Sequence, residues 1–118
     1  MAKTAMDLVQ AAKAVIQEVS VSQAQQMLNE DSIALDVREP GEYAAGHIDD
    51  AVHIPRGLLE FSIANHPEFA DKTQSIVVYC KSGGRGALAT ATLQQLGYTN
   101  AVSIIGGYDA WLAGDNDA

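Results

Sequence analysis

Four short apolar runs, rich in β-branched residues, constrain the fold of this chain more than any other feature. They are SIALDV (32–37), AVHIP (51–55), SIVVYC (75–80) and AVSIIG (101–106). Apolar and polar residues do not alternate regularly in these runs, which indicates strands buried on both faces. Segments with helical character separate them, and parallel strands need such crossovers. The sequence therefore predicts an α/β fold in which helices cover both faces of a parallel sheet.

The expected helices lie before, between and after these strands. Those between or after the strands are EPGEYAAG (39–46), RGLLEFSIANH (56–66), GALATATLQQLG (86–97) and YDAWLA (108–113). Gly97 is a natural stop for the third, because glycine often follows a helix C-terminus. Near the N-terminus we expect an amphipathic helix over 5–16, and Ser22 with Gln25 has capping-box spacing for a second helix. The apolar stripe of the first helix consists of Leu8, Val9, Ala12, Val15 and Ile16.

The size and composition of the chain are those of one globular domain. It has 118 residues, of which 47% are hydrophobic and 19% are charged. We expect a single domain over 1–118, with the N-terminal helix at about 4–17 and a short frayed tail at 114–118. Asp7 and Lys13 interrupt the apolar runs of the N-terminal segment, which predicts neither a signal peptide nor a membrane span. The expected location is cytoplasmic.

The charge of the chain limits the classes of partner that it can attract. The net charge is −8, and nucleic acids and anionic membranes attract basic surfaces, so we expect neither as a partner. The acidic residues are unevenly placed: none lies between Thr73 and Tyr108, a stretch that contains Lys81 and Arg85. This locally positive stretch favours an anionic ligand. The alternative is a buried stretch with few charges of either sign.

The only cysteine of the chain, Cys80, lies inside that stretch, at the end of the third apolar run. A single cysteine forms no intrachain disulfide. The loop after it contains Gly83 and Gly84, which can turn backbone N–H groups toward an anion beside the N-terminus of the next helix. Such a loop, with Lys81 and Arg85, would favour a nucleophilic thiolate. The alternative is a buried cysteine that acts as a small hydrophobic residue.

Three stretches together resemble a known family, the single-domain rhodanese (thiosulfate sulfurtransferase-like) family. They are LDVREPGEYAAGHIDDAVHIP (35–55), IVVYCKSGGR (76–85) and IIGGYDAW (104–111), which follow the order and spacing of the family's signatures. The resemblance implies a five-stranded parallel sheet flanked by helices. It also implies that Cys80 is the catalytic nucleophile, which carries sulfur as a persulfide, and that Asp36 and Arg38 support the site. The anion-binding loop implied by the resemblance consists of Lys81, Ser82, Gly83, Gly84 and Arg85.

The resemblance implies an enzyme that moves sulfane sulfur from thiosulfate, or from a related persulfide donor, to a thiol or cyanide acceptor. The acceptor would be a small thiol or a thioredoxin-like protein, and no cofactor or metal is expected. His47, His53 and His66 have no metal-ligand spacing with Cys80. This chain differs from the family pattern at two positions: Gly86 replaces a common serine, and Asp50 replaces a usual glycine.

Other interpretations of the same residues remain open. The loop from Cys80 to Arg85 is shorter than that of related cysteine phosphatases, and Tyr79 replaces their histidine, so a phosphatase or arsenate reductase is the weaker alternative. A sulfur carrier without turnover, or a partner-binding module, would share the same loop. Arg38 is also explained by a plain structural ion pair, for example with Glu42. We expect His47 to bond the backbone of a turn and Trp111 to be a packing residue.

Overall fold

The central element of the structure is a five-stranded parallel sheet, as predicted. The computed structural model describes residues 2–114. The strands are β1 (Glu18–Val19), β2 (Ile33–Asp36), β3 (Val52–His53), β4 (Ile76–Tyr79) and β5 (Ala101–Ile104). Their order in the sheet is β1-β5-β4-β2-β3, and all neighbours are parallel. The central strand β4 is buried over its whole length, which explains its continuous apolar run.

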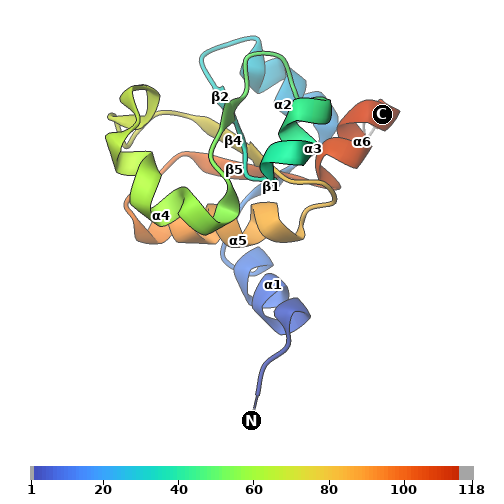
Figure 1. The fold of residues 1–118 in the computed structure, drawn as a ribbon, viewed down its shortest axis with the longest axis vertical. Helices are drawn as coiled ribbons and strands as arrows, with labels where there is room; N and C mark the ends of the chain where they lie inside the picture. Colours follow the sequence, from blue (N-terminus) through green and yellow to red (C-terminus); the bar gives the residue numbers. More distant parts are fainter. Residues whose placement is uncertain (1, 115–118) are drawn as a thin grey trace.

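Helices cover both faces of this sheet (Figure 1). One face carries α2, α3 and α6, which pack against Val77 and Tyr79 of β4, and the other carries α4 and α5, which pack against Ile76 and Val78. Alternate residues of β4 therefore serve two separate cores. The helices are α1 (Ala5–Lys13), α2 (Val21–Leu28), α3 (Pro40–Ala45), α4 (Leu59–Ser62), α5 (Gly84–Gln95) and α6 (Gly107–Ala113), and the short 3₁₀ helices are η1 (Arg56–Leu58), η2 (Ile63–Asn65) and η3 (Pro67–Phe69).

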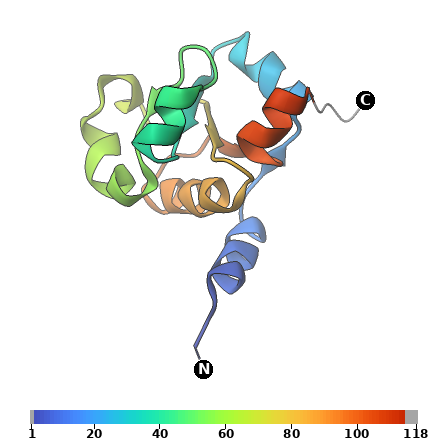
Figure 2. The same cartoon turned by 45° about the vertical axis from the view of Figure 1, so that its right-hand side comes forward.

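The first helix, α1, lies outside these layers and packs against α5 (Figures 1 and 2). Val9 and Ala12 are its buried residues, and they contact Ala87. The predicted helix exists, but it ends at Lys13. Part of its apolar stripe stays exposed, because α1 packs mainly against α5. Leu8 and Val15 remain 50% and 64% exposed.

The start of α2 corrects another expectation from the sequence. The capping box consists of Ser20 and Gln23, whose backbone N–H groups each donate to the other's side chain, and not of Ser22 and Gln25. Both pairs have the same spacing, but β1 ends at Val19 and the chain turns immediately after it. The sequence pattern also missed β1 itself, since Glu18 and Val19 do not belong to an apolar run.

The end of α5 tests one boundary that was predicted from the sequence. Gly97 follows α5 with a φ of +95°, so the predicted stop of that helix is confirmed. Beyond Gly114, the tail predicted at 114–118 lies outside the described residues. Among residues 2–114, no helix is long and apolar enough to cross a membrane.

Candidate active site

Cys80 directly follows β4, on the sheet face that α5 covers. Its side chain lies on the same side as that of Val78, and only 1% of the residue is exposed. The backbone N–H of Gly83 donates a hydrogen bond to Sγ over 3.1 Å. Gly83 has a φ of +118°, which glycine adopts readily and other residues rarely do. Within residues 2–114, this is the one N–H group that bonds the sulfur, so only part of the predicted cradle is present.

The rest of the predicted loop surrounds this cysteine at the N-terminus of α5. Lys81 and Ser82 are exposed, whereas Gly84 and Arg85 are partly buried. Since α5 begins at Gly84, the positive end of the helix dipole lies beside the sulfur. The five predicted loop residues are consecutive in the chain and lead from Cys80 into α5.

Helix α6 holds the cysteine loop from the opposite side. The backbone N–H of Tyr108 donates to the carbonyl oxygen of Cys80 over 2.7 Å, and that of Asp109 donates to the carbonyl of Lys81 over 2.9 Å. Gly107 has a φ of +59°, and a Cβ atom there would lie 2.5 Å from the Cys80 oxygen. This contact requires glycine. The sequence analysis assigned no role at the site to Gly107, although its motif was visible.

Both basic residues of the loop are paired with carboxylates from distant segments. Lys81 Nζ lies 3.0 Å from Asp109, and Arg85 donates to both Glu42 oxygens over 2.7 and 3.1 Å. The hydrogen bond from Arg85, with that from the Glu39 backbone, lowers the pKa of Glu42 to about 2. The same ion pair raises the pKa of Arg85. The stretch that is positive along the sequence is therefore largely neutralised in space.

Asp36 and Arg38 form a buried ion pair at the end of β2. The Arg38 side chain donates to Asp36 from Nε and Nη2, the latter over 2.7 Å, and also to the carbonyl oxygen of Gly46. Its guanidinium lies over the Tyr108 ring, 4.4 Å from the centroid. Burial opposes the charge, but the hydrogen bond and charge of Asp36 outweigh it and raise the pKa of Arg38.

This geometry corrects the partner suggested for Arg38. Glu42 was offered as its ion-pair partner, but Glu42 binds Arg85, and Asp36 binds Arg38. Through Gly46 and Tyr108, Arg38 connects the end of α3 to the start of α6. It therefore supports the segments around Gly46 and Tyr108, which form one wall of the site, and its own contacts are with these segments and Asp36.

Two of the three histidines, His47 and His53, bond the backbone near this ion pair. His47 Nδ1 lies 2.9 Å from the Tyr43 carbonyl oxygen, which confirms the expected turn contact, and His53 Nε2 lies 2.8 Å from the carbonyl oxygen of Arg38. Both imidazoles stack on the Tyr43 ring, at centroid distances of 3.8 and 4.5 Å. These contacts make them structural residues of the wall.

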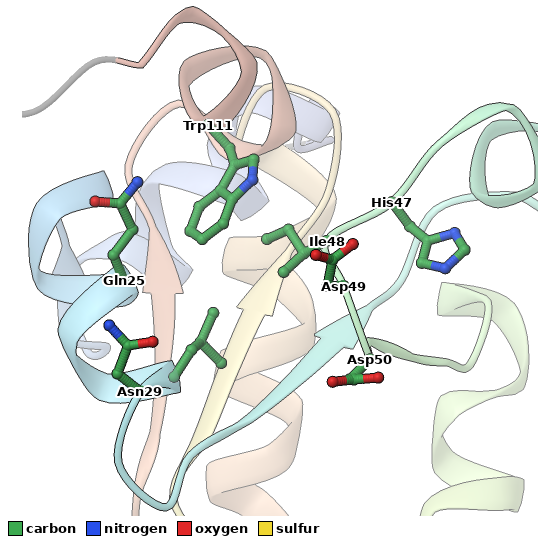
Figure 3. A pocket seen from close by; sticks show the side chains of 8 residues that line it. Gln25, Asn29, His47, Ile48, Asp49, Asp50 and Trp111 are labelled. Carbon is green, nitrogen blue, oxygen red and sulfur yellow. The ribbon is translucent and has the colours of Figure 1, made fainter.

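Two hollows border this region. One of about 410 Å³ adjoins the cysteine loop and is lined by Arg38, Glu42, Gly46, Lys81, Tyr108 and Leu112, among others. The other, of about 450 Å³, lies between α2, α6 and the loop before β3 (Figure 3). Trp111 faces Gln25 and Asn29 across it and packs against the core below, as expected for a packing residue. Of these two hollows, only the one beside Lys81 is lined by a residue of the cysteine loop.

The sequence of residues 20–114 matches the profile of the rhodanese-like domain. The chain belongs to this family. Its fold is the one expected from the resemblance.

Three relatives show how far the similarity extends. Thiosulfate sulfurtransferase 16, a chloroplast protein of Arabidopsis thaliana, is 38% identical over 103 residues, which cover 79% of this chain and 84% of that protein. Thiosulfate sulfurtransferase GlpE of Pseudomonas entomophila is 36% identical over 93 residues, covering 79% of this chain and 82% of its own. The human single-domain sulfurtransferase TSTD1 superimposes with a TM-score of 0.75 at 31% identity, over 84% of this chain and 97% of that one.

A fourth relative resembles nearly the whole chain. It is a protein of Rhodopseudomonas palustris, described as of unknown function and a possible tyrosine phosphatase. Its structure superimposes with a TM-score of 0.88 at 28% identity, over 98% of this chain and 95% of that one. The similarity therefore includes α1, which precedes the residues matched by the family profile.

Proposed function

We propose that this protein is a sulfurtransferase that moves sulfane sulfur from thiosulfate, or from a related persulfide donor, to a thiol or cyanide acceptor. The observation that carries the proposal is the position of Cys80, at the N-terminus of α5 with the Gly83 N–H directed at its sulfur. A backbone N–H group and a helix N-terminus are typical surroundings of nucleophilic cysteines in proteins. Two relatives that match most of the chain carry the name thiosulfate sulfurtransferase.

The first step loads sulfur onto Cys80. Its thiolate attacks the outer sulfur of thiosulfate, a new S–S bond forms, and the bond between the two thiosulfate sulfurs breaks. The electron pair of that bond leaves with sulfite, so no oxidant or reductant is needed. The loop N–H of Gly83 and the start of α5 then face the sulfur of a Cys80 persulfide.

The second step unloads the outer sulfur. An acceptor thiolate or cyanide attacks it, the S–S bond breaks, and the electron pair returns to Cys80 as thiolate. The hollow beside Lys81 and Tyr108 would admit a small thiol, or the reactive thiol of a thioredoxin-like protein docked over it. Such acceptors are kept reduced in the cytoplasm, where we propose that the protein acts. Proton transfer is not required, so none of the three histidines needs a chemical role, and Tyr79 needs none.

Two other functions remain as weaker candidates. The phosphatase interpretation has support in the description of the Rhodopseudomonas palustris relative. Against it, the Arg85 guanidinium is held by both oxygens of Glu42 instead of being free for a phosphate dianion. A sulfur carrier would accept one sulfur on Cys80 and deliver it only to a specific partner protein.

Turnover by the isolated protein separates these functions. With thiosulfate and cyanide, we expect thiocyanate to form repeatedly, with sulfite as co-product. Cys80→Ser should retain less than about 1% of this rate, because a serine hydroxyl is hardly ionised near neutral pH. A carrier would take up sulfur once without turnover. Hydrolysis of p-nitrophenyl phosphate without thiosulfate turnover would instead support the phosphatase interpretation.

A further inference from the structure

Ser103 lies in the middle of β5, on the same face of the sheet as Cys80. It pairs with Val78 in the register of β4 and β5, and alternation along β4 places Val78 and Cys80 on the face covered by α5. Ala101, two residues before Ser103, packs in the same core. Ser103 is fully buried, with an exposed fraction of 0%.

The hydroxyl of Ser103 has no hydrogen-bond partner among residues 2–114. Of the other buried polar residues, Asp36 and Arg38 pair with each other, and Thr90 Oγ1 donates to the Gly86 carbonyl over 2.8 Å. Two further buried atoms without a hydrogen bond, Glu18 Oε2 and Arg56 Nε, belong to partly exposed residues, and Glu18 Oε2 lies 3.2 Å from Lys13 Nζ. A buried hydroxyl without a partner destabilises a fold, since it loses its bonds to water and gains none. The Ser103 hydroxyl therefore needs an explanation other than stability.

Gly86 connects this hydroxyl to the cysteine. A Cβ atom built on Gly86 would lie 3.3 Å from Ser103 Oγ and 3.6 Å from Cys80 Sγ. Ser103 Oγ and Cys80 Sγ therefore both lie next to the position that a Cβ atom of residue 86 would occupy. Because residue 86 is glycine, no side chain fills this position. The φ of Gly86 is not in the left-handed region, so the backbone does not require glycine there. Its absent side chain instead leaves the serine hydroxyl facing the space beside the sulfur.

We propose that Ser103 is a positioning residue whose hydroxyl donates a hydrogen bond to the Cys80 sulfur when the sulfur is an anion. The serine hydroxyl and the sulfur both border the space that a side chain at Gly86 would fill, so the hydroxyl can turn toward the sulfur from β5. A neutral thiol accepts hydrogen bonds poorly, so the hydroxyl has no partner until Cys80 ionises. The inference rests on the proposed function only in that Cys80 is the reacting sulfur.

Ser103→Ala tests this role because function and stability should change in opposite directions. Removal of an unpartnered buried hydroxyl should leave the melting temperature unchanged or higher. Removal of a donor to the thiolate should slow alkylation of Cys80 by iodoacetamide about threefold to tenfold near pH 6.5. The difference should shrink to less than about twofold at alkaline pH, where the thiol is ionised in both proteins. Thr90→Val, which removes a partnered buried hydroxyl, should lower the melting temperature and leave alkylation unchanged.

Gly86→Ala provides a second variant that does not alter Ser103. Its methyl group would separate the hydroxyl from the sulfur, and so it should slow alkylation near neutral pH as Ser103→Ala does. The double variant should be no slower than the slower single variant, because both remove one interaction. The proposal is overturned if Ser103→Ala alkylates within about twofold of the wild type near pH 6.5, or is equally slowed at both pH values.

Alkylation needs no sulfur donor, so this experiment does not depend on turnover. If the pattern is found but thiosulfate is not used, the proposed function fails and the role of Ser103 stands. If thiosulfate is used but the pattern is missing, the role of Ser103 fails alone.

Discussion

Asp50 shows at the scale of one residue why glycine is usual at its position in the family. Its φ is +64°, and it is the only residue other than glycine with a positive φ in the described chain. A side chain in this left-handed conformation crowds its own backbone, which costs about 1–2 kcal/mol for most residues and somewhat less for aspartate. Asp50 is exposed at the rim of the larger hollow, where no partner among the described residues offsets that cost (Figure 3).

Asp50→Gly should therefore stabilise the protein. We expect the free energy of unfolding to rise by about 0.5–1 kcal/mol, because relief of the strained φ exceeds the added entropy of the unfolded chain. Urea unfolding measures this change. Asp49→Gly is the matched control, since Asp49 lacks a positive φ, and it should be neutral or destabilising. Equal effects of the two substitutions would contradict the explanation.

Ion pairs between single residues were the part of the site that the sequence predicted least well. Cys80, its loop and the helix after it are adjacent in the chain, so their proximity could be predicted from sequence order. The partners of Lys81 and Arg85 come from α6 and α3, and sequence spacing carries no information about such contacts. The prediction that paired Arg38 with Glu42 failed for this reason.

The ion pair between Lys81 and Asp109 leads to a prediction about the sulfur donor. The pair is exposed, and Asp109 should weaken the attraction of Lys81 for a dianion. Lys81→Ala should lower kcat/KM for thiosulfate about threefold to tenfold, and Asp109→Asn should raise it by a similar factor. Both differences should shrink as salt is added. If Asp109→Asn lowers kcat/KM, the Lys81–Asp109 ion pair acts by holding the cysteine loop in place and not by reducing the positive charge of Lys81.

At the scale of elements, the contact between α6 and the cysteine loop is the one that most depends on a glycine. Gly107→Ala would place a methyl group within 2.8 Å of Cys80 and Lys81 backbone atoms. We expect the free energy of unfolding to fall by about 2–4 kcal/mol, because overpacking and an unfavourable φ act together. Sulfur transfer should fall at least about tenfold at a temperature where the variant is folded.

Gly41→Ala is the control for this prediction. Gly41 lies in α3, and nothing lies within 4 Å of a Cβ atom there. Its replacement should leave sulfur transfer unchanged and stability unchanged or slightly higher, since alanine favours helix. If Gly107→Ala behaved in the same way, α6 would not be holding the loop in place.

The secondary structure could be predicted where one element buries a long or continuous apolar face. The runs that became β2, β4 and β5 follow this rule, as does α5 with its stop at Gly97. The rule failed for β1, which is held by pairing with β5 and has no pattern of its own. It also failed for the capping box of α2, because two pairs with equal spacing compete and only the end of β1 decides between them.

At the scale of the whole molecule, the link between Glu42 and Arg85 should make stability depend on acid pH. The pKa of Glu42 is about 2 in the folded protein, against an ordinary value of 4.5. A carboxyl whose pKa is lowered by folding stabilises the fold above its unfolded pKa and loses that effect as the pH falls. The contribution of Glu42 should therefore be present above about pH 4.5 and disappear between about pH 4.5 and 2.

Glu42→Gln tests this dependence. The variant should be less stable than the wild type near neutral pH, and the difference in urea midpoint should close as the pH is lowered through that window. Glu30→Gln is a suitable control, since Glu30 is exposed and its side chain has no hydrogen-bond or ion-pair partner among the described residues. A difference for Glu42→Gln that stays constant down to about pH 2 would contradict the assigned pKa.

The net charge of −8 describes the molecule as a whole, whereas chemistry at Cys80 depends on its neighbours. An anionic donor would approach an acidic protein at a site where both nearby basic residues, Lys81 and Arg85, are already paired with carboxylates. In the proposed function, the groups that stabilise a sulfur anion at Cys80 are mainly the Gly83 N–H, the start of α5 and, in our inference, Ser103. The account therefore predicts that sulfur is held at Cys80 by dipoles more than by side-chain charges.

The intact mass of the protein after treatment with thiosulfate tests the central claim most directly. The wild type should gain the mass of one sulfur atom and lose it again on addition of cyanide or excess thiol. Cys80→Ser should gain nothing, while keeping the wild-type circular dichroism and urea midpoint. A wild type that gains no sulfur from thiosulfate or from a persulfide donor, or a Cys80→Ser variant that gains as much, would contradict the account.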